Sequence, residues 1–519
     1  MYLKCSVVLL LICVSSGEEE DEGVTGIPDF SRTNIDRVRE GLFSLRQRSR
    51  ALIPEARFVE TSAVQSKVMA RAPTSIKRSG DTLPQINQNA GLNDILYQGD
   101  MMLTEDQLNT IITSRTSSVS SYRKRRQAYR DRYYPSTTWG STLYYYFDAT
   151  ATPKIQRAFR LAVAFWQANT CVNIVESSTQ ANRVRVFKGQ GCYSYFGTAA
   201  HELGHALGFF HTQSRYDRDN YITINFNNIQ TDYIEQFDKE SSSTNYNYGM
   251  PYDYGSIMQY GASSASKNNK ATMQAIDSEY QDTMGSDFVG FYDVSMMNEH
   301  YSCKALCPTS TSAVCKNGGF PSSRNCSECI CPSGYGGTLC DQRPVGCGQT
   351  LNATTSWQSF TDTVGDGEAV LRENHTMCYY WLQAKKGHVI QVRISSLKAV
   401  AIDGCIFGGV EVKSNKDQLL TGYRYCSSTD KGTVLTSTGN LVPIITFNRY
   451  SKTTSVFDFR EISGNSTSGT STVVEMTATT KCVDRHPNCA AYSLTGFCTN
   501  IFYTLEARTY YCSKTCGFC

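Results

Sequence analysis

The most informative segment of the sequence is His201-Glu202-Leu203-Gly204-His205-Ala206-Leu207-Gly208-Phe209-Phe210-His211. In a helix, His201 and His205 are four residues apart, so both imidazoles lie on one face and can share one metal ion. Gly208 can adopt a positive φ, which would end the helix and return His211 as a third ligand. Three imidazoles with one open position are typical of a catalytic zinc site, whereas a structural zinc is closed by four protein ligands.

Glu202 follows the first histidine directly, so on a helix it lies beside a bound metal rather than on it. There its carboxylate can accept a proton from water that the metal activates. The alternative is that these histidines are unrelated surface or core residues. Histidine is rare here, at 7 of 519 residues, so chance is a poor explanation of three histidines at these offsets.

The surrounding residues predict a domain of mixed α and β structure. Leu143–Phe147 and Arg183–Phe187 read as strands, because they alternate or are rich in aromatic residues. Lys154–Asn169 has apolar residues at helical spacing on one face, and a second helix is expected over Ala199–Gly208. We therefore expect an α+β fold with one long helix ahead of the histidine helix.

A second motif, Ser256-Ile257-Met258-Gln259-Tyr260, resembles the Met-turn of metzincins, in which Met258 would lie beneath the metal. With residues 201–219, HELGHALGFFHTQSRYDRD, it resembles the signature of nematode-type astacin metallopeptidases. The resemblance covers Tyr97 to Cys303. It implies a metzincin protease domain with one Zn²⁺ held by the three histidines. It also implies that Glu202 is the general base and that Tyr260 is an extra ligand that swings away to stabilise the oxyanion.

The same resemblance implies a latent precursor. Tyr97-Gln98-Gly99-Asp100 is similar to the family's inhibitory motif, in which Asp100 would occupy the open zinc position; an ordinary Gly-Asp turn is the alternative. Further on, Arg123–Arg126 places four cations between a cysteine-free leader and a disulfide-bearing body. We therefore predict cleavage after Arg126, which makes 17–126 a propeptide and 127–303 the protease domain.

The N-terminus predicts secretion. Lys4 precedes the apolar run Val7–Val14 and small residues, which is typical of a signal peptide over 1–16 and too short to span a bilayer. Fifty Lys+Arg against forty-seven Asp+Glu leave a net charge of +3, which argues against a nucleic-acid partner. We expect a secreted protein that contacts neither nucleic acid nor membrane.

Most of the 21 cysteines follow the protease domain and indicate an oxidising compartment. By resemblance, 304–343 is an EGF-like module, 347–460 an all-β CUB sandwich, and 482–519 a disulfide-rich ShKT tail after a Ser/Thr-rich linker over 461–480. Spacing alone leaves fifteen connectivities for six cysteines, and a zinc ribbon is the alternative for the first cluster. The resemblance implies the pairs Cys171–Cys303, Cys307–Cys326, Cys315–Cys329, Cys331–Cys340, Cys347–Cys378, Cys405–Cys426, Cys482–Cys519, Cys489–Cys512 and Cys498–Cys516.

Three features depart from the astacin pattern. Thr212 stands where the family has a glutamate that anchors the mature N-terminus. About twenty residues that normally precede the zinc helix, including a substrate-binding edge strand, are missing before Gly197, which leaves Cys192 unpaired. Asp287 stands in a loop where enzymes that cut before acidic residues carry arginine, so we expect its carboxylate to repel acidic side chains.

The sequence predicts a secreted zinc endopeptidase, made as a zymogen, that acts on extracellular or matrix proteins and binds matrix or cuticle proteins through its accessory modules. Asn352, Asn374 and Asn465 are predicted glycosylation sites. The alternative is a catalytically impaired isoform, or a matrix-binding adaptor with a degenerate protease domain, because of the short segment before the zinc helix.

Overall fold

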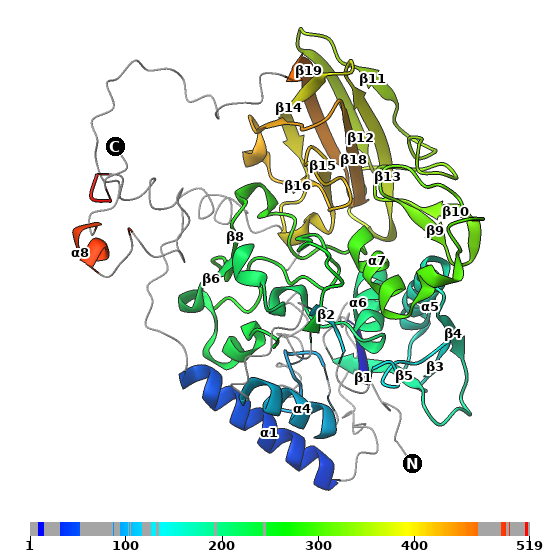
Figure 1. The fold of residues 1–519 in the computed structure, drawn as a ribbon, viewed down its shortest axis with the longest axis vertical. Coiled ribbons are helices and arrows are strands. Elements are labelled where there is room, and N and C mark those ends of the chain that lie inside the picture. Colours follow the sequence, from blue (N-terminus) through cyan, green and yellow to red (C-terminus); the bar gives the residue numbers. More distant parts are fainter. Residues whose placement is uncertain are drawn as a thin grey trace. The chain divides into compact units, whose positions relative to one another are not determined.

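The computed structural model of the chain comprises two compact units, residues 1–464 and 465–519 (Figure 1). It describes residues 9–14, 32–51, 87, 94–101, 103, 105–116, 126–130, 134–190, 195–241, 245–464, 489–494, 498 and 514–516. Among these residues, no helix combines the length and the apolar character that a bilayer crossing requires.

A parallel sheet of four strands, in the order β1-β5-β3-β4, forms one half of the protease domain. The strands are β1 (Leu9–Val14), β3 (Thr142–Phe147), β4 (Asn173–Glu176) and β5 (Val184–Gln190). Strand β1 is part of the predicted signal peptide. The two strands predicted from residues 143–147 and 183–187 are thus confirmed as β3 and β5, although β5 continues to Gln190.

Two helices pack under this sheet, α5 (Pro153–Asn169) and α6 (Phe196–Ala206). Helix α5 begins where the sequence favours it, because Pro153 is tolerated in the first turn and the Thr152 side chain accepts a hydrogen bond from the Ile155 N–H at 3.4 Å. Both predicted helices are confirmed. Helix α6 begins three residues earlier than expected and ends at Ala206, two residues before Gly208.

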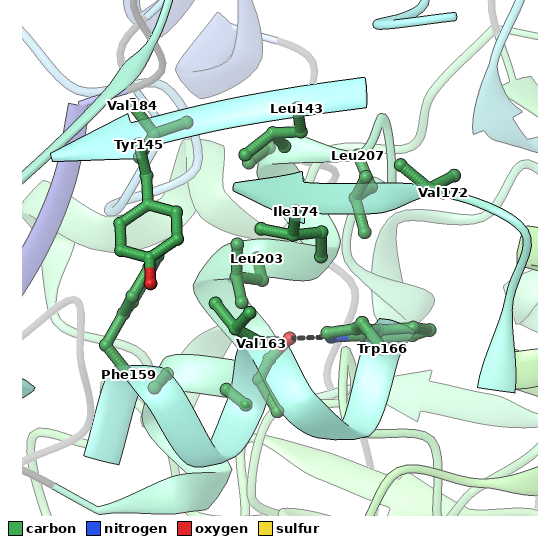
Figure 2. Packing of buried hydrophobic residues seen from close by; sticks show 14 of the residues in the cluster. Leu143, Tyr145, Phe159, Val163, Trp166, Val172, Ile174, Val184, Leu203 and Leu207 are labelled. Carbon is green, nitrogen blue, oxygen red and sulfur yellow. Dashed lines mark hydrogen bonds between the residues drawn. The ribbon is translucent and has the colours of Figure 1, made fainter. Parts of the chain in front are cut away.

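The core of this half lies between α5 and the sheet. Figure 2 shows Phe159, Val163 and Trp166 of α5 facing Leu143 and Ile174 of the strands. The fully buried Trp166 also donates its indole N–H to the Ala200 carbonyl of α6 at 3.1 Å. Burying such a side chain stabilises the fold by about 2 to 3 kcal/mol. This hydrogen bond fixes α6, and with it the histidines, against the long helix.

The other half of the protease domain has short strands, 3-10 turns and one further helix, α7 (Phe291–His300). Strand β2 (Arg126–Tyr129) pairs with β7 (Asn245–Tyr246), and β6 (Ile222–Ile224) pairs with β8 (Met273–Ala275). The 3-10 turns span Thr212–Ser214, Arg218–Asn220, Phe226–Asn228, Thr231–Phe237, Ser278–Tyr280 and Cys303–Leu306. Cys171, just after α5, forms a disulfide with Cys303.

The N-terminal segment (residues 17–126) contributes two described helices, α1 (Arg32–Ala51) and α4 (Glu105–Thr116). They form a small apolar cluster of their own, which includes Leu42 and Leu108 and takes in Phe210 from the protease domain. Arg46 on α1 forms an ion pair with Glu235 at 2.9 Å. The N-terminal segment therefore packs against the same chain region that follows the histidine helix.

A small module after the protease domain contains the hairpin β9 (Phe320–Ser322) and β10 (Asn325–Ile330). Its disulfides join Cys307 to Cys326, Cys315 to Cys329 and Cys331 to Cys340. Arg324 donates to the carbonyls of Gln167 at 2.9 Å and Thr170 at 2.8 Å, which lie at the C-terminal end of α5. A cation is favourable at this end of a helix, so the hairpin caps α5. Its assignment as an EGF-like module stays a prediction.

Two packed sheets form the β-sandwich (residues 347–464). One sheet has the order β11-β13-β18-β15-β16 and the other β12-β19-β14-β17. The strands are β11 (Thr350–Asn352), β12 (Gln358–Val364), β13 (Leu371–Gln383), β14 (His388–Lys398), β15 (Gly408–Val412), β16 (Tyr423–Tyr425), β17 (Val434–Thr436), β18 (Leu441–Tyr450) and β19 (Thr453–Ser463). Two 3-10 turns, Asp403–Cys405 and Ser428–Asp430, connect them.

Disulfides Cys347–Cys378 and Cys405–Cys426 staple this β-sandwich. An all-β sandwich was expected here, and its assignment as a CUB domain stays a prediction. Asn352 and Asn374 are both exposed, as glycosylation requires, whereas Asn465 lies outside the described residues.

The second unit is described in three short pieces, which include α8 (Cys489–Leu494) and the disulfide Cys498–Cys516. Cys489 is disulfide-bonded. Its predicted partner Cys512 lies outside the described residues, as do Cys482, Cys519 and the predicted unpaired Cys192.

Candidate active site

Helix α6 carries His201, Glu202 and His205, all of them buried. The helix can sit directly on the Met-turn (Ser256–Tyr260) because residue 204 is glycine. A Cβ atom at Gly204 would lie 2.7 Å from the Met258 sulfur, closer than real Cβ contacts allow. Met258 therefore lies against the helix that bears two of the histidines.

The chain turns sharply after α6 to bring back the third histidine. Gly208 has φ of 109°, in the region that favours glycine, which confirms the turn predicted at this residue. The Gly208 and Phe209 N–H groups donate to the carbonyls of His205 and Gly204, both at 2.9 Å, so the end of the helix is satisfied. His211 follows this turn and is fully buried.

The three imidazoles converge through their Nε2 atoms. His205 Nε2 lies 3.0 Å from His201 Nε2 and 3.2 Å from His211 Nε2. The Nδ1 atoms of His201 and His205 are placed to donate to the carbonyls of Ile257 at 2.8 Å and Phe209 at 2.7 Å. With their protons on Nδ1, both rings direct an Nε2 lone pair toward the same point.

This arrangement fits a zinc ion. Zn–N bonds of about 2.0–2.1 Å in tetrahedral geometry separate the nitrogens by roughly 3.3 Å, close to the spacing found here. Burial lowers the pKa of His205 well below its usual value, and it also lowers the pKa of His211. Both changes favour the neutral imidazole, which is the form that binds metal. The buried atom Asp100 Oδ1 lies beside them with no hydrogen-bond partner among the described residues.

Asp100 of the N-terminal segment lies directly against the three histidines. Its carboxylate is 3.0 Å from His211 Nε2 and 3.6 Å from the Nε2 atoms of both His201 and His205. Burial alone would raise the pKa of Asp100, but the neighbouring histidines, led by His211, outweigh burial and hold it well below the usual value. The four side chains together form a cluster whose ligand atoms could hold one metal ion.

Glu202 and Tyr260 complete the cluster. Burial raises the pKa of the Glu202 carboxyl well above its usual value, and the nearby Asp100 charge raises it further. The Tyr260 hydroxyl lies 2.7 Å from the Gln98 carbonyl oxygen and 3.1 Å from Asp100 Oδ2. Burial raises the pKa of Tyr260 as well, so its hydroxyl stays protonated and can donate a hydrogen bond.

Thr212, which departs from the astacin pattern, forms two hydrogen bonds with the Met-turn. Its N–H donates to the Met258 carbonyl, and its hydroxyl donates to Ser256 Oγ, both at 2.9 Å. Ser256 in turn donates to Asp293 at 2.6 Å, and Asp293 also accepts the Ile257 N–H at 2.9 Å. Thr212 therefore links the third histidine to the Met-turn.

Sequence reasoning missed three residues that support the cluster: Gln98, Glu240 and Asp293. The Gln98 amide oxygen lies 3.0 Å from His211 Nδ1, and its amide nitrogen donates to Glu240 at 2.8 Å. Gln98 lies inside the quoted inhibitory motif, where its amide could have been considered as a partner for a histidine. Neither Glu240 nor Asp293 has a motif that points to it, because their partners are distant in the sequence.

Asp287 has a partner that the sequence did not predict. Its side chain forms an ion pair with Arg449 of the β-sandwich, and the Arg449 side chain is almost fully buried. The Arg449 guanidinium also lies 4.8 Å from the ring centre of Tyr195, at the start of α6. The expectation that the Asp287 carboxylate repels acidic side chains stays a prediction.

The junction before the zinc helix is short, as the sequence indicates. Strand β5 ends at Gln190 and α6 begins at Phe196, while residues 191–194, with Cys192, lie outside the described residues. Arg126, the predicted processing residue, is the first residue of β2. The short junction leaves the geometry of the three histidines intact.

Three imidazoles converge here, a buried glutamate lies on the helix that carries two of them, and a methionine packs against that helix. Together these features define the site of a metal-dependent peptidase. The model of the peptidase family Astacin matches residues 131–302, and that of the ShK domain-like family matches residues 481–519.

Zinc metalloproteinase nas-31 of Caenorhabditis elegans is 60% identical over 500 residues, covering 90% of this chain and 82% of that protein. Zinc metalloproteinase nas-32 of the same organism is 36% identical over 498 residues, covering 84% and 74%. High choriolytic enzyme 1, a hatching enzyme zinc-protease from the medaka fish Oryzias latipes, aligns with 34% of this chain and 98% of its own. Its 24% identity and TM-score of 0.31 are too low to carry an argument.

The chain belongs to the astacin family and is a zinc metalloendopeptidase of the nematode type, with an ShK module at its C-terminal end. Its cofactor is one zinc ion.

Proposed function

We propose that this peptidase is secreted as an inactive precursor and, once its N-terminal segment is cut off, hydrolyses peptide bonds in extracellular proteins. The observation that carries the proposal is the position of Asp100, whose carboxylate lies within 3.0 to 3.6 Å of all three histidine Nε2 atoms. A carboxylate in that place occupies the position that water and substrate need.

We assign the zinc ligands as His201, His205 and His211. The ion, when bound, supplies a Lewis acid that activates water and polarises the carbonyl of the scissile peptide bond. Hydrogen bonds from the Nδ1 atoms of His201 and His205 to backbone carbonyls orient both rings and set their tautomer.

Glu202 acts as the general base. It takes a proton from the attacking water and delivers it to the leaving nitrogen. Burial raises the pKa of the Glu202 carboxyl above its usual value, which favours its uptake of a proton from water. Tyr260 donates a hydrogen bond from its hydroxyl to the oxygen that becomes negatively charged in the transition state. That hydroxyl faces two acceptors of the N-terminal segment, Gln98 and Asp100, and removing the segment frees it.

Processing after Arg126 would remove Asp100 together with Gln98. Both side chains lie against the histidines, so one cut withdraws the carboxylate and also the amide that pairs with His211. We therefore propose Arg126 as the activating cleavage site and 17–126 as the propeptide.

The apolar run near the N-terminus and the many disulfides support secretion. The disulfide hairpin, the β-sandwich and the ShK module are proposed to act as EGF-like, CUB and ShKT modules that bind matrix or cuticle proteins. Glycosylation at Asn352, Asn374 and Asn465 fits the same compartment.

The alternative, a degenerate protease domain that serves only as an adaptor, is not favoured. The reason for this alternative was the short segment before the zinc helix. Helix α6 nevertheless forms from Phe196, and the three histidines converge. The lack of the edge strand would affect how a peptide substrate binds, whereas the three histidines that hold zinc keep their geometry.

The decisive experiment is Glu202→Gln in the chain cleaved after Arg126. We expect the rate on an unfolded protein substrate to fall by about 10² to 10⁴, the usual contribution of a general base, while zinc content stays at one per chain. Glu176→Gln, at a half-exposed glutamate on β4, is the matched control and should change neither. An unchanged rate in Glu202→Gln would overturn the proposed mechanism.

A further inference from the structure

The β-sandwich contacts the protease domain on both sides of the Met-turn. After the Met-turn, Asp403 of the sandwich accepts hydrogen bonds from the Ser263 N–H at 2.7 Å and the Ser263 hydroxyl at 2.5 Å. Gly261, the residue that directly follows Tyr260, also touches this aspartate, since a Cβ there would lie 3.0 Å from the Asp403 Cβ. The sandwich thus reaches within one residue of Tyr260.

Before the Met-turn, Thr421 of the sandwich makes the corresponding contact. Its hydroxyl donates to Asp253 at 3.1 Å, and its backbone N–H lies 3.3 Å from both carboxylate oxygens of Asp253. Asp253 is buried, and it also accepts the Gly255 N–H at 3.0 Å, one residue before Ser256. The sandwich therefore packs against the residues that flank the Met-turn, Gly255 and Gly261, and forms hydrogen bonds with Asp253 and Ser263.

The two surfaces approach too closely for side chains at several points. A Cβ at Gly255 would lie 2.3 Å from Thr421 Cγ2, and a Cβ at Gly404 would lie 2.0 Å from the Gly285 carbonyl oxygen. Gly404 has φ of 69°, so glycine is favoured there for its backbone as well. Such close packing leaves little room for the loops around the Met-turn to move.

We propose that the β-sandwich is part of the catalytic apparatus: Asp403, acting through Ser263, is a positioning residue that holds Tyr260 in place for the reaction. The Asp403 carboxylate fixes the residues that follow Tyr260, and the contact of Thr421 with Asp253 fixes the residues that precede the Met-turn. The inference rests on the proposed role of Tyr260 as donor to the reacting oxygen.

An ion pair elsewhere between the protease domain and the β-sandwich provides a control. Arg157 on α5 pairs with Glu373 on β13, on a different part of the interface and with the arginine side chain 62% exposed. This pair joins the domains without touching the Met-turn. Glu373→Ala therefore reports what the loss of an ordinary contact between the domains does to activity.

The test uses the full chain cleaved after Arg126 and measures kcat and KM separately on a peptide substrate. Asp403→Ala should lower kcat by about tenfold and leave KM within about twofold, since a residue that positions a transition-state donor affects the chemical step. Asp403→Asn keeps an oxygen acceptor for Ser263 and should recover most of the rate. Glu373→Ala should leave kcat unchanged.

A double-mutant cycle shows whether Asp403 acts through Tyr260. In a Tyr260→Phe background the donor is already lost, so Asp403→Ala should cause little further loss of kcat. The same tenfold loss in both backgrounds, or an unchanged kcat in Asp403→Ala alone, would overturn the proposal.

Amide hydrogen exchange separates this inference from the proposed function. Asp403→Ala should speed exchange in a peptide covering 256–263 and leave peptides from β3 and α5 as slow as before. If Tyr260→Phe alone left kcat unchanged, the role of Tyr260 would fail, and the exchange result would still decide whether Asp403 holds the Met-turn. Unchanged exchange over 256–263 would contradict the positioning role.

Discussion

Two parts of the chain cover the protease domain, the N-terminal segment and the β-sandwich, and they do so by different means. The N-terminal segment holds its helices together by its own apolar cluster and reaches the site with a few polar side chains, chiefly Gln98 and Asp100. The sandwich places polar groups, such as the buried Thr421 and the partly buried Asp403, and close-packed glycines against the loops behind the site. One cover places a carboxylate against the histidines, whereas the other contacts the loops that surround them.

The largest effect should come from removing the blocking carboxylate. Asp100→Ala in the uncut chain should raise peptidase activity on the order of a hundredfold, because a tethered ligand competes at an effective concentration in the millimolar range. Asp94→Ala, at an exposed aspartate that pairs with Arg39 in the same segment, is the control and should leave the uncut chain inactive. An Asp100→Ala chain that stays inactive would count against latency through this side chain.

The next effect tests the packing of the histidine helix α6 on the Met-turn, which lies at the site itself rather than in either cover. Gly204→Ala would place a methyl group 2.7 Å from the Met258 sulfur, so we expect a loss of about 1 to 3 kcal/mol of unfolding free energy. Thermal or denaturant unfolding of the full chain measures it. Gly439→Ala, at a residue of the sandwich with nothing within 4 Å of its Cβ position, should be close to neutral.

Acid should destabilise both the protease domain and the β-sandwich, because each contains a buried neutral histidine. Burial and the nearby Arg130 lower the pKa of His300 in the protease domain to about 4, and burial and Arg449 lower the pKa of His375 in the sandwich to about 3. Because these folded-state pKa values lie below the unfolded value of about 6.5, the stability they provide is complete above pH 6.5 and is lost as the pH falls toward 4 and 3.

At pH 5 the His300 contribution amounts to about 2 kcal/mol relative to pH 7. Denaturant unfolding between pH 7 and 5 measures the slope. His300→Gln should flatten it for the protease domain and His375→Gln for the sandwich, and a slope that neither substitution changes would contradict the assignment.

The smallest effect concerns how firmly the N-terminal segment docks. Arg46→Ala removes the largely buried ion pair with Glu235 and should raise activity of the uncut chain a few-fold, which corresponds to about 1 kcal/mol. Arg37→Ala breaks a more exposed pair with Glu105 inside the segment and should have no such effect. Equal activity in the two variants would show that the Arg46 contact does not hold the segment in place.

The sequence predicts the parts of the fold and site that depend on local patterns. The apolar spacing of residues 154–169 predicts α5, and the spacing of His201, His205 and Gly208 predicts the helix, its turn and a shared metal. These inferences succeed because helical periodicity and glycine stereochemistry act over a few residues.

The contacts between domains could not be predicted in the same way. Asp403 and Ser263 are 140 positions apart, and the partners Asp287 and Arg449 are also distant in the sequence. A buried polar pair has no period in the sequence, so only the folded chain shows which charges meet. The partner of Asp287 could not be predicted for this reason, because Arg449 belongs to a different domain.

The proposed processing site lies in a segment whose backbone is already paired. Arg126 is the first residue of strand β2, which pairs with β7. The Tyr129 N–H, at the end of the same strand, donates to the Gly208 carbonyl at 2.8 Å. The proposed cleavage after Arg126 would therefore require β2 to separate from β7 before a protease could bind this segment as an extended chain. The rate of that local opening would then limit how fast the N-terminal segment is removed.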